Sequence, residues 1–132
     1  MKVNSVSVCI VTEKICEVRD FYIKYFDARA VFDCGWYISL EFGDGSTSLQ
    51  FMVAQQDQAP CHSSGLMYNL SVADVDAEYR RLTAEGVSIV MPLEDRSWGD
   101  RGFAIEDPCG VILYIYSDRE PSDEFKQYYD RW

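Results

Sequence analysis

The chain has 132 residues, with 12 Lys and Arg against 22 Asp and Glu, which gives a formal net charge of −10 at pH 7. This balance argues against a nucleic-acid partner, which needs clustered basic residues, and against adhesion to anionic membranes, and no apolar run reaches the ~18 residues of a membrane span. The length suits one domain, and 48% hydrophobic with 26% charged residues is typical of a globular protein, so we expect a cytoplasmic location.

The first half of the chain predicts a strand, a helix and three further strands. Val6, Val8 and Ile10 alternate with polar residues, as in a half-buried strand. The apolar residues of 14–26 recur at helical spacing, which predicts an amphipathic helix. Three strands and a polar linker then follow, at residues 30–34, 36–42, 48–54 and 55–64.

The second half repeats this order. Alternation over 66–72 predicts a strand, and a helix is expected from the Asp74 cap to Gly86. Next come a short strand that Pro92 ends, a polar loop and a hairpin, at residues 88–91, 93–100, 102–106 and 111–116. Phe125, Tyr129 and Trp132 share one face of a short helix predicted for the last residues.

These elements predict an α+β fold built from tandem βαβββ modules. The modules cover about residues 3–54 and 65–117 of a single domain, 1–120, and 121–132 form a C-terminal helix. One face of the strands carries polar, small or adaptable residues, among them Cys9, Gln50, Asn69, Tyr114 and Tyr116. A second core layer would be aliphatic, so we predict that this face lines a cavity, although a wet sheet face without function is the alternative.

Cysteine and histidine content limits metal chemistry. The five cysteines contain no Cys-x-x-Cys pair, and His62 is the only histidine. Structural zinc sites need four thiolate or imidazole ligands at short spacings, and catalytic zinc sites need three protein ligands. We therefore expect reduced thiols and no metal or other cofactor.

Three motifs resemble those of the vicinal oxygen chelate superfamily. The helix-one motif is DFYIKYF at 20–26, and the entry to the second helix is SVADVDA at 71–77. The third motif, WGDRGF at 98–103 followed by DPCG at 107–110, is similar to the glyoxalase, bleomycin resistance and dioxygenase branch. The resemblance implies two modules that form a cup-shaped mixed sheet, with a ligand cleft on the concave face and pairing into a homodimer.

The resemblance also bears on metal binding. Metal-dependent members place His, Glu or Gln, His and Glu on the concave strands, and the matching positions here are Ser7, Gln50, Met67 and Tyr114. Of these four side chains, only that of Gln50 can bind a hard cation. The resemblance therefore implies a member without a metal.

Candidate site residues each have a functional and a structural interpretation. Trp98 is an aromatic wall or a loop anchor, Trp36 lines the cleft or stabilises a turn, and Arg101 binds an anion or forms a structural ion pair. Glu41 is a weak candidate for a general base, or a solvent-facing residue. The predicted ligand-binding set is Ser7, Trp36, Gln50, Met67, Asn69, Trp98, Arg101, Tyr114 and Tyr116.

Two functions follow as hypotheses from this set. The first is a metal-free, dimeric binding protein of the bleomycin-resistance type, which sequesters a planar, cationic small molecule without chemistry and so confers antibiotic resistance. The alternative is a lyase or isomerase of the same fold that uses protein acids and bases on a small oxygenated metabolite. A ligand-free interaction module is a third class, which the polar strand face disfavours.

Overall fold

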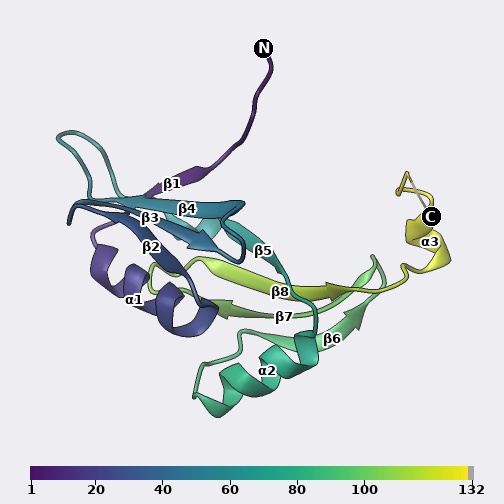
Figure 1. Cartoon of the computed structure of the whole chain (residues 1–132). Helices are drawn as coiled ribbons and strands as arrows, with labels where there is room; N and C mark the ends of the chain where they lie inside the picture. Colours follow the sequence, from purple (N-terminus) through teal and green to yellow (C-terminus); the bar gives the residue numbers. More distant parts are fainter. Residues whose placement is uncertain (131–132) are drawn as a thin grey trace. The chain divides into compact units, whose positions relative to one another are not determined.

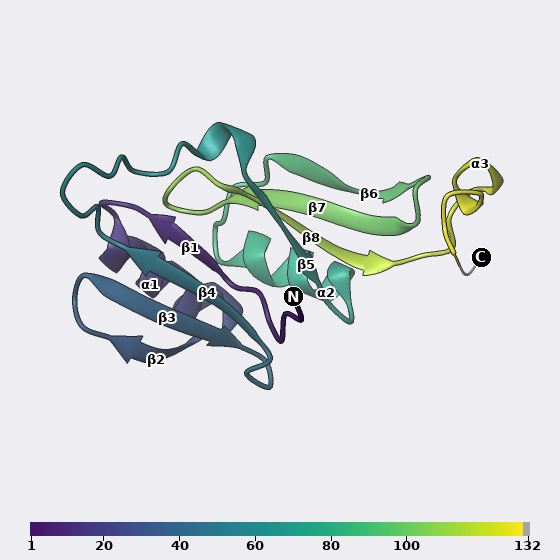
Figure 2. The same cartoon turned by 90° about the horizontal axis from the view of Figure 1, so that it is seen from above.

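The structure is a computed structural model, described for residues 1–130, and it contains two open four-stranded mixed sheets with a helix on one face of each (Figures 1 and 2). The first sheet lies in a unit of residues Met1–His62 and the second in a unit of Ser63–Trp132, called unit 1 and unit 2 below. The predicted α+β class and the tandem βαβββ order are confirmed. No helix within residues 1–130 is both long and apolar enough to cross a membrane.

Unit 1 is one mixed sheet with the helix α1 packed on one of its faces. Its elements are β1 (Val8–Val11), α1 (Ile15–Phe26), β2 (Arg29–Asp33), β3 (Tyr37–Phe42) and β4 (Thr47–Met52). The strand order is β1-β4-β3-β2, with β1 parallel to β4 and the other pairs antiparallel. The helix buries Val18 and Tyr22 against this sheet, and the Tyr22 ring stacks on Phe51 with 5.8 Å between centroids.

The predicted first strand is shorter in the structure than the alternation suggests. Val6 is 83% exposed and Val8 43% exposed, and of the three predicted core residues only Ile10 is buried. The ladder with β4 begins at Val8, and the residues before it run away from the sheet (Figure 1). Without a ladder partner, Val6 has no sheet face to occupy.

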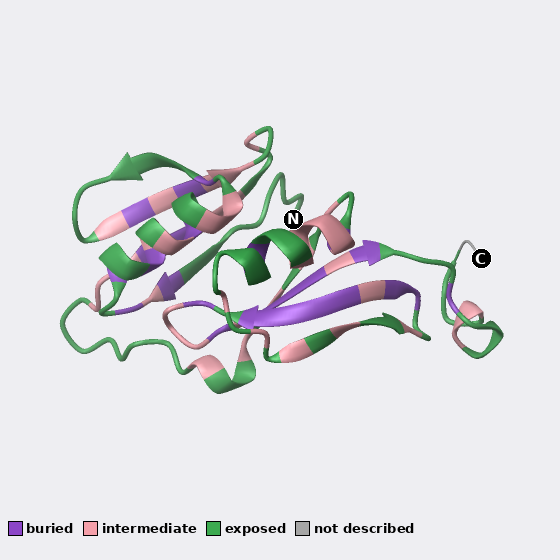
Figure 3. Ribbon diagram, turned by 90° about the horizontal axis from the view of Figure 1, so that it is seen from below, coloured by how far each residue is buried: buried purple, intermediate pink, exposed green. Residues whose placement is uncertain are grey.

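Unit 2 repeats the arrangement and adds a C-terminal helix. Its elements are η1 (Ser63–Gly65), β5 (Met67–Ser71), α2 (Val75–Ala84), β6 (Met91–Arg96), β7 (Asp100–Glu106), β8 (Ile112–Asp118) and α3 (Asp123–Lys126). The strand order is β5-β8-β7-β6. The strand β7, one of the two inner strands of this sheet, is buried over nearly its whole length, as its colour in Figure 3 shows.

Local sequence determines where α2 begins and ends. The Asp74 carboxylate accepts a 3.0 Å hydrogen bond from the backbone N–H of Ala77, which satisfies one of the free donors of the first turn. The hydroxyl of Ser117 accepts from the Val75 N–H at 3.0 Å and so ties this helix start to β8. Gly86, with φ +82°, follows the last turn. The predicted helix is confirmed.

Two sequence predictions in unit 2 are wrong. Of the strand predicted for 88–91 only Met91 lies in a strand, and most of the loop predicted for 93–100 belongs to the strand β6, with a turn at 97–99 before β7 begins at Asp100. Proline is tolerated because β6 is an edge strand and its register shifts between Met91 and Glu94. The final helix covers only Asp123–Lys126, with turns after it, and Trp132 lies outside the described residues.

Candidate functional site

A cavity of about 540 Å³ opens on unit 2, on the sheet face opposite α2. Strands β5, β6 and β8 contribute Met67, Asn69, Met91, Tyr114, Tyr116 and Asp118. The β6–β7 turn, the start of β7 and the C-terminal segment contribute Trp98, Gly99, Asp100 and Tyr129. Side chains alternate between the two faces of a strand, which explains why these residues share the cavity face. On β7, Arg101 and Phe103 point toward α2, and their neighbours point to the opposite face.

Small residues on β7 make room for the two tyrosines of β8. In the ladder, Gly102 stands opposite Tyr116 and Ala104 opposite Tyr114. A Cβ atom on Gly102 would lie 2.5 Å from Cζ and from the hydroxyl oxygen of Tyr114, so this glycine is required by the ring that lies over it. The Tyr114 and Tyr116 rings stack at 5.8 Å with an interplanar angle of 15°. Both rings belong to the cavity lining and form its floor.

A buried carboxylate holds two of the cavity's aromatic side chains in place. Asp100 is 8% exposed, and it accepts hydrogen bonds from the Tyr114 hydroxyl at 2.5 Å and from the Trp98 indole N–H at 2.7 Å. Burial, helped by the bond to Asp100, raises the pKa of Tyr114 to about 12. At neutral pH Tyr114 therefore stays protonated, and its proton is committed to Asp100.

Arg96 of β6 lies over the Trp98 ring. Its guanidinium carbon is 6.0 Å from the Trp98 ring centroid, which is a cation–π distance. The same guanidinium contacts Glu94 at 2.9 Å and donates to the Pro92 carbonyl at 2.8 Å. Arg96 is not among the residues that line the cavity, but it also acts on the Tyr114 hydroxyl, where its charge opposes part of the rise in the pKa of Tyr114.

The charge of the cavity lining is negative. Asp118 stands directly opposite Asp100 in the β7–β8 ladder, and both lie on the cavity side. The Asp118 side chain is exposed and has no ion-pair partner within residues 1–130. The lining residues, all of which the structure describes, include no Lys, Arg or His. Such a surface favours a cationic ligand.

Arg101 is not a cavity residue, which corrects its place in the predicted ligand-binding set. Its side chain points to the α2 side and pairs with Asp76 at 3.0 Å and with Asp95 at 3.4 Å. The hydrogen bonds from Arg101 lower the pKa of Asp76. The structural interpretation, an ion pair that ties β7 to α2, describes this arginine.

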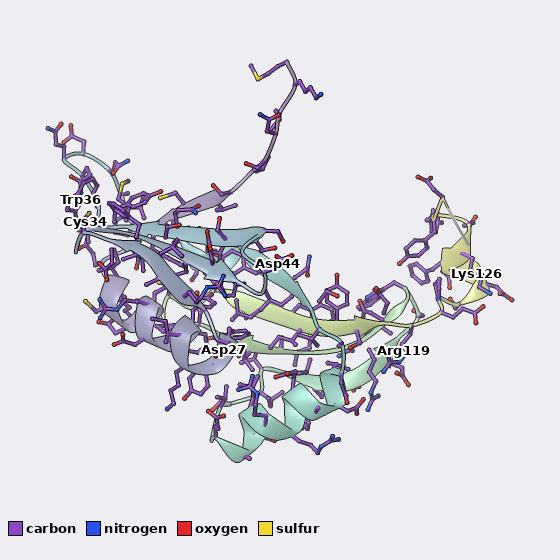
Figure 4. The ribbon with its side chains drawn as sticks, in the orientation of Figure 1. Asp27, Cys34, Trp36, Asp44, Arg119 and Lys126 are labelled. Carbon is purple, nitrogen blue, oxygen red and sulfur yellow. The ribbon has the colours of Figure 1, made fainter. Side chains whose placement is uncertain are left out.

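Three predicted site residues lie in unit 1, outside the cavity. Ser7 precedes β1 and is exposed, and the ladder places Cys9 instead beside Gln50. Trp36 is 50% exposed beside the β2–β3 turn, where Figure 4 labels it next to Cys34. The Gln50 amide N–H donates to the hydroxyls of Ser39 at 3.1 Å and Ser48 at 3.0 Å.

Glu41, the weak catalytic candidate, also lies in unit 1. It stands opposite Arg29 in the β2–β3 ladder and contacts its guanidinium at 3.5 Å. The carboxylate is about one-third exposed and has this cation beside it. An exposed ion pair of this kind stabilises the edge of a sheet weakly.

The residues at the family's metal positions do not fit a divalent metal. The Tyr114 hydroxyl is bonded to Asp100, and the Gln50 amide N–H donates to two serines. The buried Oε1 of Gln50 has no hydrogen-bond partner among the described residues, but one amide oxygen falls short of the three protein ligands that a catalytic metal site needs. Burial raises the pKa of Cys9, which disfavours its thiolate. Within the part of the chain that the structure describes, no three His, Cys, Asp or Glu side chains are grouped as metal ligands. The donor set gives no support to metal chemistry.

Comparison with known proteins agrees with this two-module fold. The family model for the Glyoxalase/Bleomycin resistance protein/Dioxygenase superfamily matches residues 4–115. The chain therefore belongs to this superfamily, which confirms the resemblance seen in the motifs. It is 32% identical over 113 residues to the uncharacterised protein Mb0911c of Mycobacterium bovis, covering 76% of this chain and 74% of that one.

Solved structures share the fold. A glyoxalase/bleomycin resistance protein/dioxygenase from Nocardioides superposes with a TM-score of 0.73 at 20% identity, over 91% of this chain and 86% of that one. The virulence protein STM3117 from Salmonella typhimurium gives a TM-score of 0.72 at 18% identity, over 89% and 99% of the two chains. At such identities the likeness extends to the fold alone.

Proposed function

We propose that this protein is a metal-free small-molecule-binding protein that holds a planar, cationic ligand in the unit 2 cavity. One observation carries the proposal, namely a lining with four aromatic residues and two carboxylates but no basic side chain. The net charge of −10 adds long-range attraction for the same class of ligand. Sequestration of a cationic, partly planar antibiotic of the bleomycin type is the physiological role that we infer.

The fixed aromatic walls support binding without chemistry. Trp98 and Tyr114 are both anchored on Asp100, so little side-chain freedom is lost when a ligand stacks on them. A cation placed over such a ring gains roughly 0.5–2 kcal/mol, depending on how dry the site is. The Tyr114 proton is held by Asp100 and its pKa is about 12, so this phenol is a poor general acid.

The alternative, a lyase or isomerase, has less support. Its acid–base candidate Glu41 is paired with Arg29 and is not among the residues that line the cavity. The carboxylates at the cavity are one anchored group, Asp100, and one exposed group, Asp118. An acid–base enzyme needs a group that can give a proton to its substrate or take one from it, and both oxygens of Asp100 are already occupied by hydrogen bonds.

Tryptophan fluorescence tests the proposed function. Bleomycin should change the emission saturably, and Trp98→Phe should remove most of this change because Trp98 lines the cavity. Trp36→Phe is the matched control, because Trp36 is half-exposed in unit 1. A titration without a saturable signal, or a signal that depends on Trp36 instead, contradicts the proposal.

A further inference from the structure

The chain beyond the family match contributes part of the cavity. The match ends at residue 115, yet Tyr116, Asp118 and Tyr129 all lie in the lining. Figure 4 labels Arg119 at the start of the C-terminal segment, residues 119–130, and Lys126 at the end of α3. This segment lies beyond the residues that the family model matches.

The C-terminal segment is docked on the β6–β7 turn. The backbone N–H groups of Arg119 and Ser122 donate to the carbonyls of Gly99 and Ser97, both at 2.9 Å. The Tyr129 hydroxyl donates to the Trp98 carbonyl. The segment is thus attached to the turn that carries the indole wall of the cavity.

Gly99 allows Tyr129 to approach this turn. A Cβ atom on Gly99 would lie 3.1 Å from the Tyr129 hydroxyl and 3.3 Å from Cβ of Pro121, which is buried. Its φ of +122° also belongs to a conformation that favours glycine. Tyr129 lines the cavity and is 43% exposed.

A cationic group of a ligand can bind the Asp118 carboxylate more readily than the Asp100 carboxylate. Both oxygens of Asp100 accept hydrogen bonds, one from Tyr114 and one from Trp98. Asp118 faces it across the ladder, and like charges directly opposite each other destabilise a strand pair. A ligand cation at Asp118 offsets this repulsion, so the strand pair itself favours a positive group there.

We propose that residues 116–130 select the ligand, with the Tyr129 ring contacting a planar aromatic cation and Asp118 binding its ammonium or amidinium group. This inference rests on the proposed function and names the features of the ligand that the cavity distinguishes. Anionic planar molecules of similar size are excluded by the two carboxylates. Neutral ones lose the contact with Asp118.

Dye binding to the full-length chain tests the selection. Thioflavin T is a planar cationic probe, and 1-anilinonaphthalene-8-sulfonate is an anionic probe of similar size. Wild type should bind thioflavin T more tightly than the anionic dye, and added salt should weaken the binding of thioflavin T. Tyr129→Ala should weaken thioflavin T binding about tenfold through loss of the ring, whereas Tyr129→Phe, which keeps the ring, should retain it.

Matched variants separate local contacts from general effects. Tyr128→Ala removes the neighbouring ring, which is 74% exposed and outside the cavity lining, and it should change affinity less than about twofold. Asp118→Asn should weaken thioflavin T binding about fivefold at low salt. Asp57→Asn removes the same charge from an exposed turn of unit 1 and should have little effect. Circular dichroism verifies that each variant is folded.

The outcomes distinguish this inference from the proposed function. Wild type that binds neither thioflavin T nor bleomycin overturns both. Wild type that binds thioflavin T while Tyr129→Ala and Asp118→Asn behave like Tyr128→Ala and Asp57→Asn overturns the inference alone. Preference for the anionic dye overturns the assigned ligand charge. Because Asp118 is exposed at the end of β8, Asp118→Asn gives a readout even if Tyr129→Ala perturbs the segment.

Discussion

At the scale of single residues, one close contact determines the floor of the cavity. The Tyr114 ring lies over Gly102, and its hydroxyl reaches Asp100 two residues before that glycine. Gly102 leaves the space that the Tyr114 ring occupies, and the hydrogen bond to Asp100 orients the Tyr114 hydroxyl. The geometry therefore depends on both residues together.

Gly102→Ala tests this contact. The added Cβ would lie 2.5 Å from Tyr114 ring atoms, so the ring must move and its bond to Asp100 is strained or lost. We expect a loss of about 1–3 kcal/mol in the free energy of unfolding, measured by urea denaturation. Gly65→Ala, which meets no atom within 4 Å in the same unit, is the control. Equal stability of the two variants contradicts the account.

Tyr114 also makes stability depend on pH in the alkaline range. Its folded-state pKa of about 12 lies above the ordinary tyrosine value of about 10, so the folded state holds the proton more tightly than the unfolded state. This contribution, on the order of 2 kcal/mol, is complete below pH 10 and is lost as the pH rises toward 12. Urea denaturation across this range should show a steeper fall for wild type than for Tyr114→Phe. Parallel curves would exclude the raised pKa.

At the scale of elements, the predictions succeeded where local signals were strong. The helix α2 has a capping aspartate, an apolar stripe and a terminal glycine, and all three lie where the sequence places them. The prediction for β6 was wrong because proline usually ends a strand. Pro92 is tolerated within β6 only because this strand lies at the edge of the sheet, which the sequence does not reveal. The length of the last helix was predicted wrongly because the helical spacing of its apolar residues continues beyond the residues that are helical.

The same error explains what the site prediction missed. Residues 93–100 were expected to be a loop, so Asp100 and Arg101 had no assigned strand face. In β7 the two point to opposite sides, which puts Asp100 in the cavity and Arg101 against α2. Tyr114, Tyr116, Met67, Asn69 and Trp98 lie in the cavity lining, as their predicted role requires. Asp118 was missed because the predicted strand ended at residue 116, although the alternation of Tyr114 and Tyr116 continues to Asp118 in β8. Tyr129 carries no sequence signal for this site, because only the docking of the C-terminal segment brings it there.

Capping offers a test at the element scale. Asp74→Ala removes an observed N-cap hydrogen bond of α2 and should cost about 1 kcal/mol of stability. Ser122 occupies the N-cap position of α3, where its side chain makes no capping bond, so Ser122→Ala should cost much less. Thermal unfolding of both variants gives the comparison. A larger loss for Ser122→Ala contradicts the assignment.

At the scale of the whole molecule, each of the two sheets is open. The edges are β1 and β2 in unit 1 and β5 and β6 in unit 2, and every residue of β2 is exposed. Open edges are sites at which two copies of a chain can pair. The homodimer remains a prediction that follows from these edges and from the family resemblance.

Light scattering tests the dimer. At micromolar concentration we expect a particle of twice the chain mass of 15.2 kDa, independent of added chelator. Dilution should separate the chains only when the interface is weak, and the mass should then fall toward one chain. A single-chain mass throughout the micromolar range contradicts the dimer.

The central claim is that the unit 2 cavity binds a planar cation without a metal. Calorimetric titration of the EDTA-treated protein with metal-free bleomycin tests it most directly. We expect saturable binding with one ligand per chain, weakened at high salt and largely lost in Trp98→Ala, which removes the indole wall anchored on Asp100. Binding that appears only after a divalent metal is restored to the protein, or that is unchanged in Trp98→Ala, would contradict the claim.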